Sequence, residues 1–98
     1  MAIKILIKRR IPENFYNPQF GDLLRQLRGL VLSQKGYISG ETLRRVDDPR
    51  EYLVMGTWQN VASWEAWRAS PMRAEVQKQI DDLLSTPTEY AVYEYPYV

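Results

Sequence analysis

Hydrophobic and polar residues alternate strictly over residues 2–9, with isoleucine at every second position and mostly lysine between. A period of two predicts a β-strand that buries one face. After a loop over residues 11–16, Asn17 and Pro18 are typical of a helix start, because Asn caps the first turn and proline suits the first helical position. Apolar residues then recur three and four positions apart, which predicts an amphipathic helix. Gly36 is expected to cap this helix at its C-terminus in a left-handed conformation.

The middle of the chain predicts two more strands joined by a tight turn. Residues 37–46 predict the first of them. Asp47, Asp48 and Pro49 favour a turn, because Asp bonds its own backbone and proline presets φ. Residues 52–58 are apolar at nearly every position, which predicts a strand buried on both faces.

Two helices and a last strand are expected after this hairpin. Asn60 is a suitable cap for a short helix, and the Ser-Pro pair at residues 70–71 restarts or kinks it into a longer one, whose inward face begins at Met72. Residues 88–97 predict a tyrosine-rich strand. The order β-α-β-β-α-β predicts an α+β, ferredoxin-like fold with a four-stranded antiparallel sheet. Residues 1–98 are expected to form a single domain.

The composition excludes several classes of site. The 98 residues contain no cysteine and no histidine. Disulfide frameworks, thiol nucleophiles, imidazole bases and zinc sites are therefore excluded or strongly disfavoured, and we expect no metal site. The 13 basic and 12 acidic residues leave a net charge of +1, which steers the chain neither to nucleic acid nor to a membrane. Without an apolar run of about 20 residues or a signal-peptide pattern, a cytoplasmic protein is expected.

The face of the sheet away from the helices is expected to need a cover. Leu6 lies among lysines, and Tyr90, Tyr93 and Tyr95 make the last strand aromatic. A second copy of the sheet or a stacked nucleic acid could provide this cover. Residues 35–37 begin like the strand motif of RNA-recognition domains, but the following residues break it and it falls on the wrong strand. We therefore predict a homodimer that pairs through this face, with the three tyrosines at the interface or in the barrel, and no nucleic-acid partner.

A family resemblance also indicates that a second copy of the sheet covers this face. Residues 36–41 (GYISGE), 52–58 (YLVMGTW) and 63–67 (SWEAW), followed by the Ser-Pro pair at 70–71, occur in an order and spacing that resemble the antibiotic biosynthesis monooxygenase (ABM) domain family. The resemblance covers nearly the whole chain. It implies a dimeric α+β barrel, in which two sheets pack face to face and each subunit holds a pocket between helices and sheet.

One branch of this family oxidises aromatic polyketides or quinols with O₂ and without metal or cofactor. This chain resembles that branch at Trp58. Four residues earlier the branch carries Asn, whereas this chain has Val54, which cannot donate a hydrogen bond. Near the pocket tyrosine of that branch the chain has Trp64.

A second branch binds and degrades haem with an Asn-Trp-His set. Trp67 falls on the Trp of that set, but the His position is Gln77 and the Asn falls near Lys8. Without an imidazole the iron would lack its usual axial ligand, so haem degradation is disfavoured.

The leading hypothesis is a cofactor-independent monooxygenase acting on a small electron-rich aromatic, quinol or polyketide-like. The pocket candidates are Trp58, Asn60, Trp64, Trp67, Arg73 and Gln77. In this hypothesis the tryptophans shape an apolar pocket, and one of the three polar residues orients a phenolic oxygen. Such tryptophans serve more often in core or dimer packing than in chemistry. For Arg73 and Gln77, contacts with the neighbouring acids Glu75 or Asp81 (a salt bridge for Arg73, a hydrogen bond for Gln77) are favoured over a pocket role. A non-catalytic dimeric module that binds a small ligand remains the alternative function.

Overall fold

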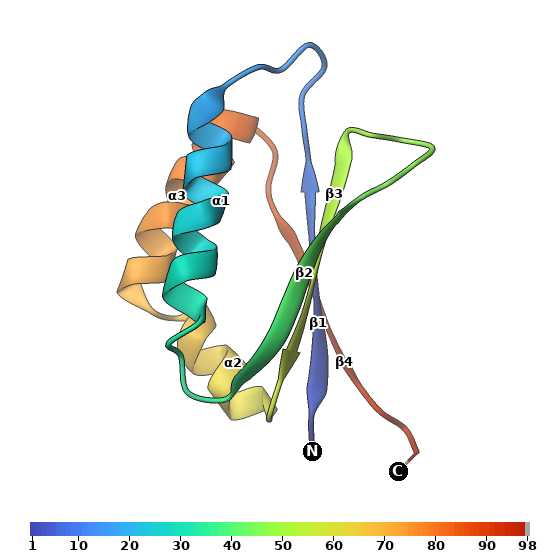
Figure 1. Ribbon diagram of the computed structural model, residues 1–98, viewed down its shortest axis with the longest axis vertical. Coiled ribbons are helices and arrows are strands. Elements are labelled where there is room, and N and C mark those ends of the chain that lie inside the picture. Colours follow the sequence, from blue (N-terminus) through green and yellow to red (C-terminus); the bar gives the residue numbers. More distant parts are fainter. Residues whose placement is uncertain (98) are drawn as a thin grey trace.

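The computed structural model describes residues 1–97 as a four-stranded sheet with helices packed on one face (Figure 1). The strands are β1 (Ile3–Arg10), β2 (Tyr37–Arg44), β3 (Glu51–Trp58) and β4 (Glu89–Glu94), and the helices are α1 (Pro18–Val31), α2 (Val61–Arg68) and α3 (Pro71–Leu84). The strand order is β2-β3-β1-β4, with every pairing antiparallel. This is the α+β, ferredoxin-like fold predicted from the sequence. Val98, the last residue of the predicted domain, lies outside the described residues.

The predicted helix starts are confirmed at the level of single hydrogen bonds. The Asn17 side chain accepts a hydrogen bond of 2.9 Å from the backbone N–H of Gln19. The Asn60 side chain accepts one of 2.8 Å from the N–H of Ser63. Each bond satisfies an N–H group that the first turn of a helix leaves free. Pro71 then begins α3 as a helix separate from α2.

The predicted role of Gly36 as a helix cap is wrong. Helix α1 ends at Val31, five residues earlier, and the side chains of Ser33 and Gln34 both donate to the Leu30 carbonyl of its last turn. Gly36 does adopt a positive φ of 87°, which glycine tolerates at little cost. It uses this conformation to enter β2, where its carbonyl accepts a 2.8 Å hydrogen bond from the N–H of Gln59.

Two clusters of buried side chains form the core. The first joins the sheet to α2 and contains Ile3, Ile5, Trp58, Trp64 and Trp67. The second joins α1 to α3 and contains Phe20, Leu23, Val76, Ile80 and Leu84. The prediction that Met72 faces inward is wrong, because Met72 is exposed and its neighbour Arg73 is buried instead. The core of α3 thus begins with a charged residue.

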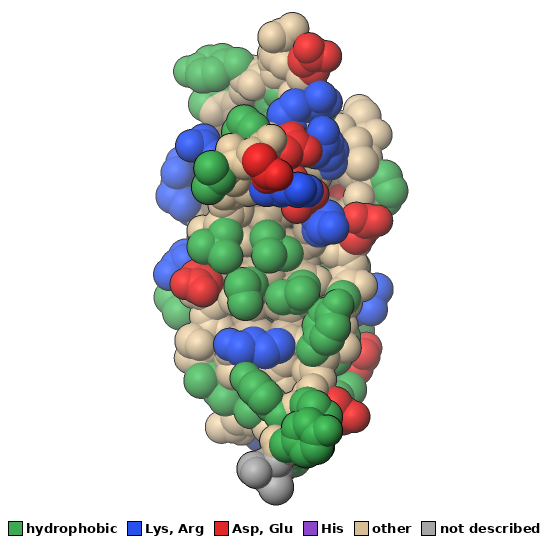
Figure 2. All heavy atoms as spheres, turned by 90° about the vertical axis from the view of Figure 1, so that its right-hand side faces the viewer, with side chains coloured by type: hydrophobic (Ala, Val, Ile, Leu, Met, Phe, Trp, Pro, Cys, Tyr) green, Lys and Arg blue, Asp and Glu red, His purple; other side chains and the backbone are tan. Residues whose placement is uncertain are grey.

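The face of the sheet away from the helices carries an apolar band. The pairing register places Leu6, Leu43, Leu53, Met55, Ala91 and Tyr93 on this open face. Figure 2 shows hydrophobic side chains across its middle, with charged side chains gathered toward one end. In the single chain, Leu53 and Met55 are only half-buried, whereas β3 was predicted to be buried on both faces. The expectation for Tyr90 is corrected, since it pairs with Ile7 and faces the helices.

Candidate functional site

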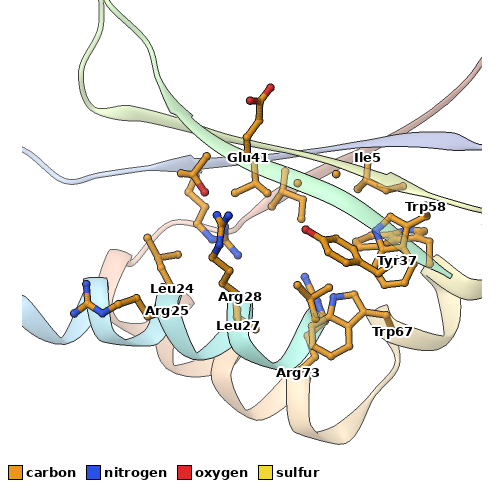
Figure 3. A pocket seen from close by; sticks show the side chains of 18 of the residues that line it. Ile5, Leu24, Arg25, Leu27, Arg28, Tyr37, Glu41, Trp58, Trp67 and Arg73 are labelled. Carbon is orange, nitrogen blue, oxygen red and sulfur yellow. The ribbon is translucent and has the colours of Figure 1, made fainter. Parts of the chain in front are cut away.

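A cavity of about 320 Å³ lies between α1 and the helix-facing side of the sheet (Figure 3). Its size falls at the lower end of the range for small-molecule sites. The strands contribute Ile5, Ile7, Arg9, Tyr37, Gly40, Glu41, Thr42, Val54, Gly56 and Trp58, and the helices contribute Gly21, Leu24, Arg25, Leu27, Arg28, Val31, Trp64, Trp67 and Arg73. Most of this lining is apolar, so the cavity suits an apolar or aromatic body.

Two glycines provide the space on the sheet side. Gly40 in β2 and Gly56 in β3 lie directly opposite each other in the register, so no side chain fills the cavity there. A Cβ at Gly40 would approach the hydroxyl of Tyr37 to 2.6 Å, whereas a Cβ at Gly56 would meet the Trp58 indole nitrogen at an ordinary 3.6 Å. Figure 3 shows the Tyr37 hydroxyl pointing into the cavity. The cavity therefore depends on the absence of side chains at this pair.

The three tryptophans form one wall of the cavity and do not fill it. Trp58, Trp64 and Trp67 are each at most 5% exposed. The rings of Trp58 and Trp64 meet edge to face, with centroids 6.0 Å apart, a favourable aromatic geometry. The same side chains thus serve as core and as cavity wall, and the indole N–H of Trp64 finds no hydrogen-bond partner among residues 1–97.

Two buried arginines extend from different elements to the cavity. Arg9 comes from β1, and its Nη2 donates to Gln77 Oε1 at 2.9 Å. Arg73 comes from α3, and its Nη2 donates to the Tyr90 hydroxyl at 2.7 Å, with a longer contact of 3.5 Å to the same Gln77 oxygen. Gln77 in turn donates to Asp81 at 2.9 Å. This network holds both guanidinium groups in place by bonds to β4 and α3.

The charge of Arg9 is poorly solvated. Burial lowers its pKa to about 10, and the positive charge of Arg73 acts in the same direction. The group therefore stays protonated at neutral pH. Arg73 lies 5.2 Å from the centre of the Tyr90 ring, which Arg68 also approaches at 4.6 Å. Tyr90 thus packs against cations inside the subunit instead of lying at the predicted interface.

The structure brings most of the predicted pocket residues together. Trp58, Trp64, Trp67 and Arg73 line the cavity. Gln77 lies directly behind the lining, hydrogen-bonded to Arg9. Asn60 is outside the lining, and its side-chain oxygen is already used by the cap of α2. The predicted contact of Gln77 with Asp81 is present as a hydrogen bond. The predicted salt bridge of Arg73 is wrong, because Arg73 bonds to the neutral oxygens of Tyr90 and Gln77.

Sequence reasoning missed Arg9. The signal was present, since Arg9 continues the inward series of Ile3, Ile5 and Ile7 on β1. An arginine on the apolar side of an alternating strand is uncommon and calls for a partner. Lys8, the position near which the haem-degrading branch has its Asn, pairs with Leu53 on the open face.

The remaining lining carries little that could hold a metal. Within residues 1–97, no group of three or more acidic, histidine or cysteine side chains has the arrangement of a metal site. Val54 lines the cavity at the position where the cofactor-independent branch has Asn.

No helix in the described part of the chain is long and apolar enough to cross a membrane.

The fold and the cavity together define a ferredoxin-like domain with a cavity between helices and sheet. The family model described as antibiotic biosynthesis monooxygenase matches residues 5–79. The chain therefore belongs to the antibiotic biosynthesis monooxygenase family. The predicted family is thus confirmed.

Solved structures show the same fold at low sequence identity. A conserved protein from Methanosarcina mazei Go1 superposes with a TM-score of 0.83 and 20% identity, over 94% of this chain and 90% of that chain. SnoaB, a cofactor-independent oxygenase from Streptomyces nogalater, superposes with a TM-score of 0.82 and 12% identity, over 99% and 95% of the two chains. No curated protein matches the sequence.

Proposed function

We propose that the protein is a cofactor-independent monooxygenase that oxidises a small electron-rich aromatic compound, quinol or polyketide-like, in this cavity. The observation that carries the proposal is an apolar cavity with an aromatic wall and two buried cations, Arg9 and Arg73. The similarity to SnoaB in fold and the membership of the family support it. Histidine and cysteine are absent from the sequence, which fits chemistry supplied by the substrate.

In this reaction the protein positions the substrate and stabilises the negative charge of the substrate anion. An anthrone, for example, loses a proton from its ring methylene and becomes an anion that O₂ can oxidise. O₂ accepts four electrons from the substrate. One oxygen atom becomes the new carbonyl oxygen, and the other leaves as water with the two methylene hydrogens. Buried cations such as Arg9 and Arg73 favour the anion over the neutral substrate, which is the electrostatic contribution expected of a preorganised site.

Oxygen uptake with a panel of anthrones and hydroquinones tests the proposal. The informative variant is Thr42→Trp, because Thr42 lines the cavity from an exposed position on β2 where a large side chain does not disturb the core. Arg44→Trp is the matched control, since Arg44 is exposed on the same strand and the same side but outside the lining. We expect uptake by wild type and Arg44→Trp and a strong loss in Thr42→Trp. Absence of uptake with every compound would refute the proposal.

The alternative is a non-catalytic module that binds a small ligand. The observation that favours it is Val54, which gives the cavity wall no hydrogen-bond donor at the position where the family's oxygenase branch has one. Saturable binding of the same aromatic panel without any oxygen consumption would support this alternative.

We also propose that two copies pair through the open face of the sheet. The apolar band centred on Leu53 and Met55 favours a cover that excludes water. Sedimentation equilibrium at micromolar concentration provides the test. We expect a dimer for wild type and a monomer for Met55→Asp. Met72→Asp, an equally charged change at an exposed position on α3, should remain dimeric. A monomeric wild type would rule the pairing out.

A further inference from the structure

Arg9 and Arg73 are buried cations that make no direct ion pair in the described part of the chain. They are 3% and 4% exposed. Among residues 1–97, neither guanidinium lies in an ion pair with a carboxylate. Their hydrogen-bond acceptors are the neutral oxygens of Gln77 and Tyr90. A buried charge that finds only neutral acceptors is unfavourable, so this pair is suited to receiving a negative charge from elsewhere.

Unused hydrogen-bond donors lie in the same place. In the described part of the chain, two buried side-chain nitrogens have no partner, Arg9 Nε and Trp64 Nε1. Both residues line the cavity. Buried polar groups in proteins are almost always hydrogen-bonded, so such exceptions need an explanation. A ligand whose oxygen atoms displace the groups that now cover these nitrogens would supply the missing acceptors.

The charges around the cavity favour one negative charge on that ligand. Within the network, Asp81 is the acid that acts on Arg9, and it offsets one of the two arginine charges. At the cavity mouth, Arg28 extends from α1 toward the sheet, whereas Glu41 points away from the cavity (Figure 3). One positive charge is left without a counter-charge at the inner end, and the mouth attracts anions as well. A monoanion therefore balances the charge that is left on the Arg9–Arg73 pair.

Geometry distinguishes a carboxylate from a phenolate. Two guanidinium groups from different elements converge on Gln77 Oε1, at 2.9 Å from Arg9 and 3.5 Å from Arg73. A carboxylate offers two oxygens with four lone-pair positions, enough for donors on both arginines. A phenol offers a single oxygen and becomes charged only after it loses its proton. A carboxylate carries its charge at neutral pH in every molecule.

We propose that the cavity selects an aromatic monocarboxylate, whose carboxylate binds Arg9 and Arg73 while its ring packs against the tryptophan wall. This inference rests on the proposed function for the location of the site. It goes further in requiring a fixed negative charge on the ligand, separate from the ring position that is oxidised. Arg9 then acts as a residue that determines substrate specificity.

Calorimetric titration with 1-naphthoate and naphthalene-1-carboxamide tests the proposal, because these probes share their shape and differ in charge. The titrations are done without oxygen, so that no turnover is needed. We expect naphthoate to bind at least about tenfold more tightly than the carboxamide, the effect of one charge-assisted hydrogen-bond set. Arg9→Met should remove that preference by weakening the binding of naphthoate. Arg44→Met, at an exposed position outside the lining, should keep it.

Equal affinities for the two probes in wild type, or no binding of naphthoate at millimolar concentration, would overturn the inference. The wild-type comparison decides the matter even if Arg9→Met fails to fold, and Arg73→Met provides a second variant. The two proposals fail separately. A preference for naphthoate with no oxygen uptake on any aromatic would refute the monooxygenase alone. Uptake with neutral quinols and equal probe affinities would refute the carboxylate alone.

Discussion

Replacing Arg9 by methionine is expected to stabilise the protein in the absence of a ligand. Methionine keeps most of the length of the arginine stem and removes the charge. Burial lowers the pKa of Arg9 to about 10. Because one pKa unit corresponds to about 1.4 kcal/mol, holding the charged form in the folded state costs about 3 kcal/mol. The substitution also loses the hydrogen bond to Gln77, which contributes about 1 kcal/mol.

The net expectation is a gain of about 2 kcal/mol in the free energy of unfolding. For a domain of this length that corresponds to a rise in Tm of about 10 °C. Urea denaturation at pH 7, followed by tryptophan fluorescence, measures the free energy, and calorimetry measures Tm. Arg44→Met, which changes an exposed arginine on β2, should stay within about 0.5 kcal/mol of wild type.

The sign of the pH dependence is a further check. A lowered pKa of a basic group means that the unfolded state binds its proton more tightly than the folded state. The cost of Arg9 is therefore constant below about pH 10 and is relieved only at higher pH. The difference between Arg9→Met and wild type should accordingly be the same at pH 6 and pH 9. A loss of stability in Arg9→Met would refute the reasoning, because it would show that neutral acceptors already compensate this charge.

Three other substitutions have definite expected outcomes. Asn60→Ala should lower the free energy of unfolding by about 1 kcal/mol and leave ligand affinity unchanged, since Asn60 caps α2 outside the cavity; a change in affinity without loss of stability would contradict this. Gly36→Ala should destabilise by more than about 1 kcal/mol in denaturant titration, because the backbone has a φ of 87° and a Cβ would collide with Ser63. The hydrogen bond from Arg10 holds the pKa of Asp48 below its ordinary value, so this stabilisation is present above about pH 4 and lost as the pH falls. Asp48→Asn should thus lose less stability than wild type between pH 7 and pH 2.5, and parallel pH profiles would refute the assignment.

The elements could be predicted because their signals are local. The caps at Asn17 and Asn60 each involve a side chain and an N–H two or three residues away. The alternation over β1 and the turn before β3 are likewise contained within a few residues. The order of these elements then limits the topology to very few arrangements. The family resemblance also predicted a pocket between helices and sheet, and the cavity lies there.

The errors concern features that depend on distant parts of the chain. Gly36 has the predicted positive φ, but its carbonyl accepts a hydrogen bond from the N–H of Gln59, which directly follows β3. Met72 and Arg73 are adjacent, and it is Arg73 that is buried. Its guanidinium donates a hydrogen bond to the hydroxyl of Tyr90, 17 residues away in the sequence. Hydrophobic periodicity favours methionine at such a position and carries no information about that partner.

The facing glycines of β2 and β3 also make the volume of the cavity easy to change. A methyl group at Gly56 would occupy space that no other atom needs, its closest contact being 3.6 Å from the Trp58 indole. At Gly40 the same methyl would force the Tyr37 hydroxyl to move. A side chain at Gly56 therefore changes the volume of the cavity, whereas one at Gly40 changes the position of the Tyr37 hydroxyl in it. Neither glycine lies on β1 or α3, the elements that carry Arg9 and Arg73, so a change of cavity volume at these positions leaves both buried arginines in place.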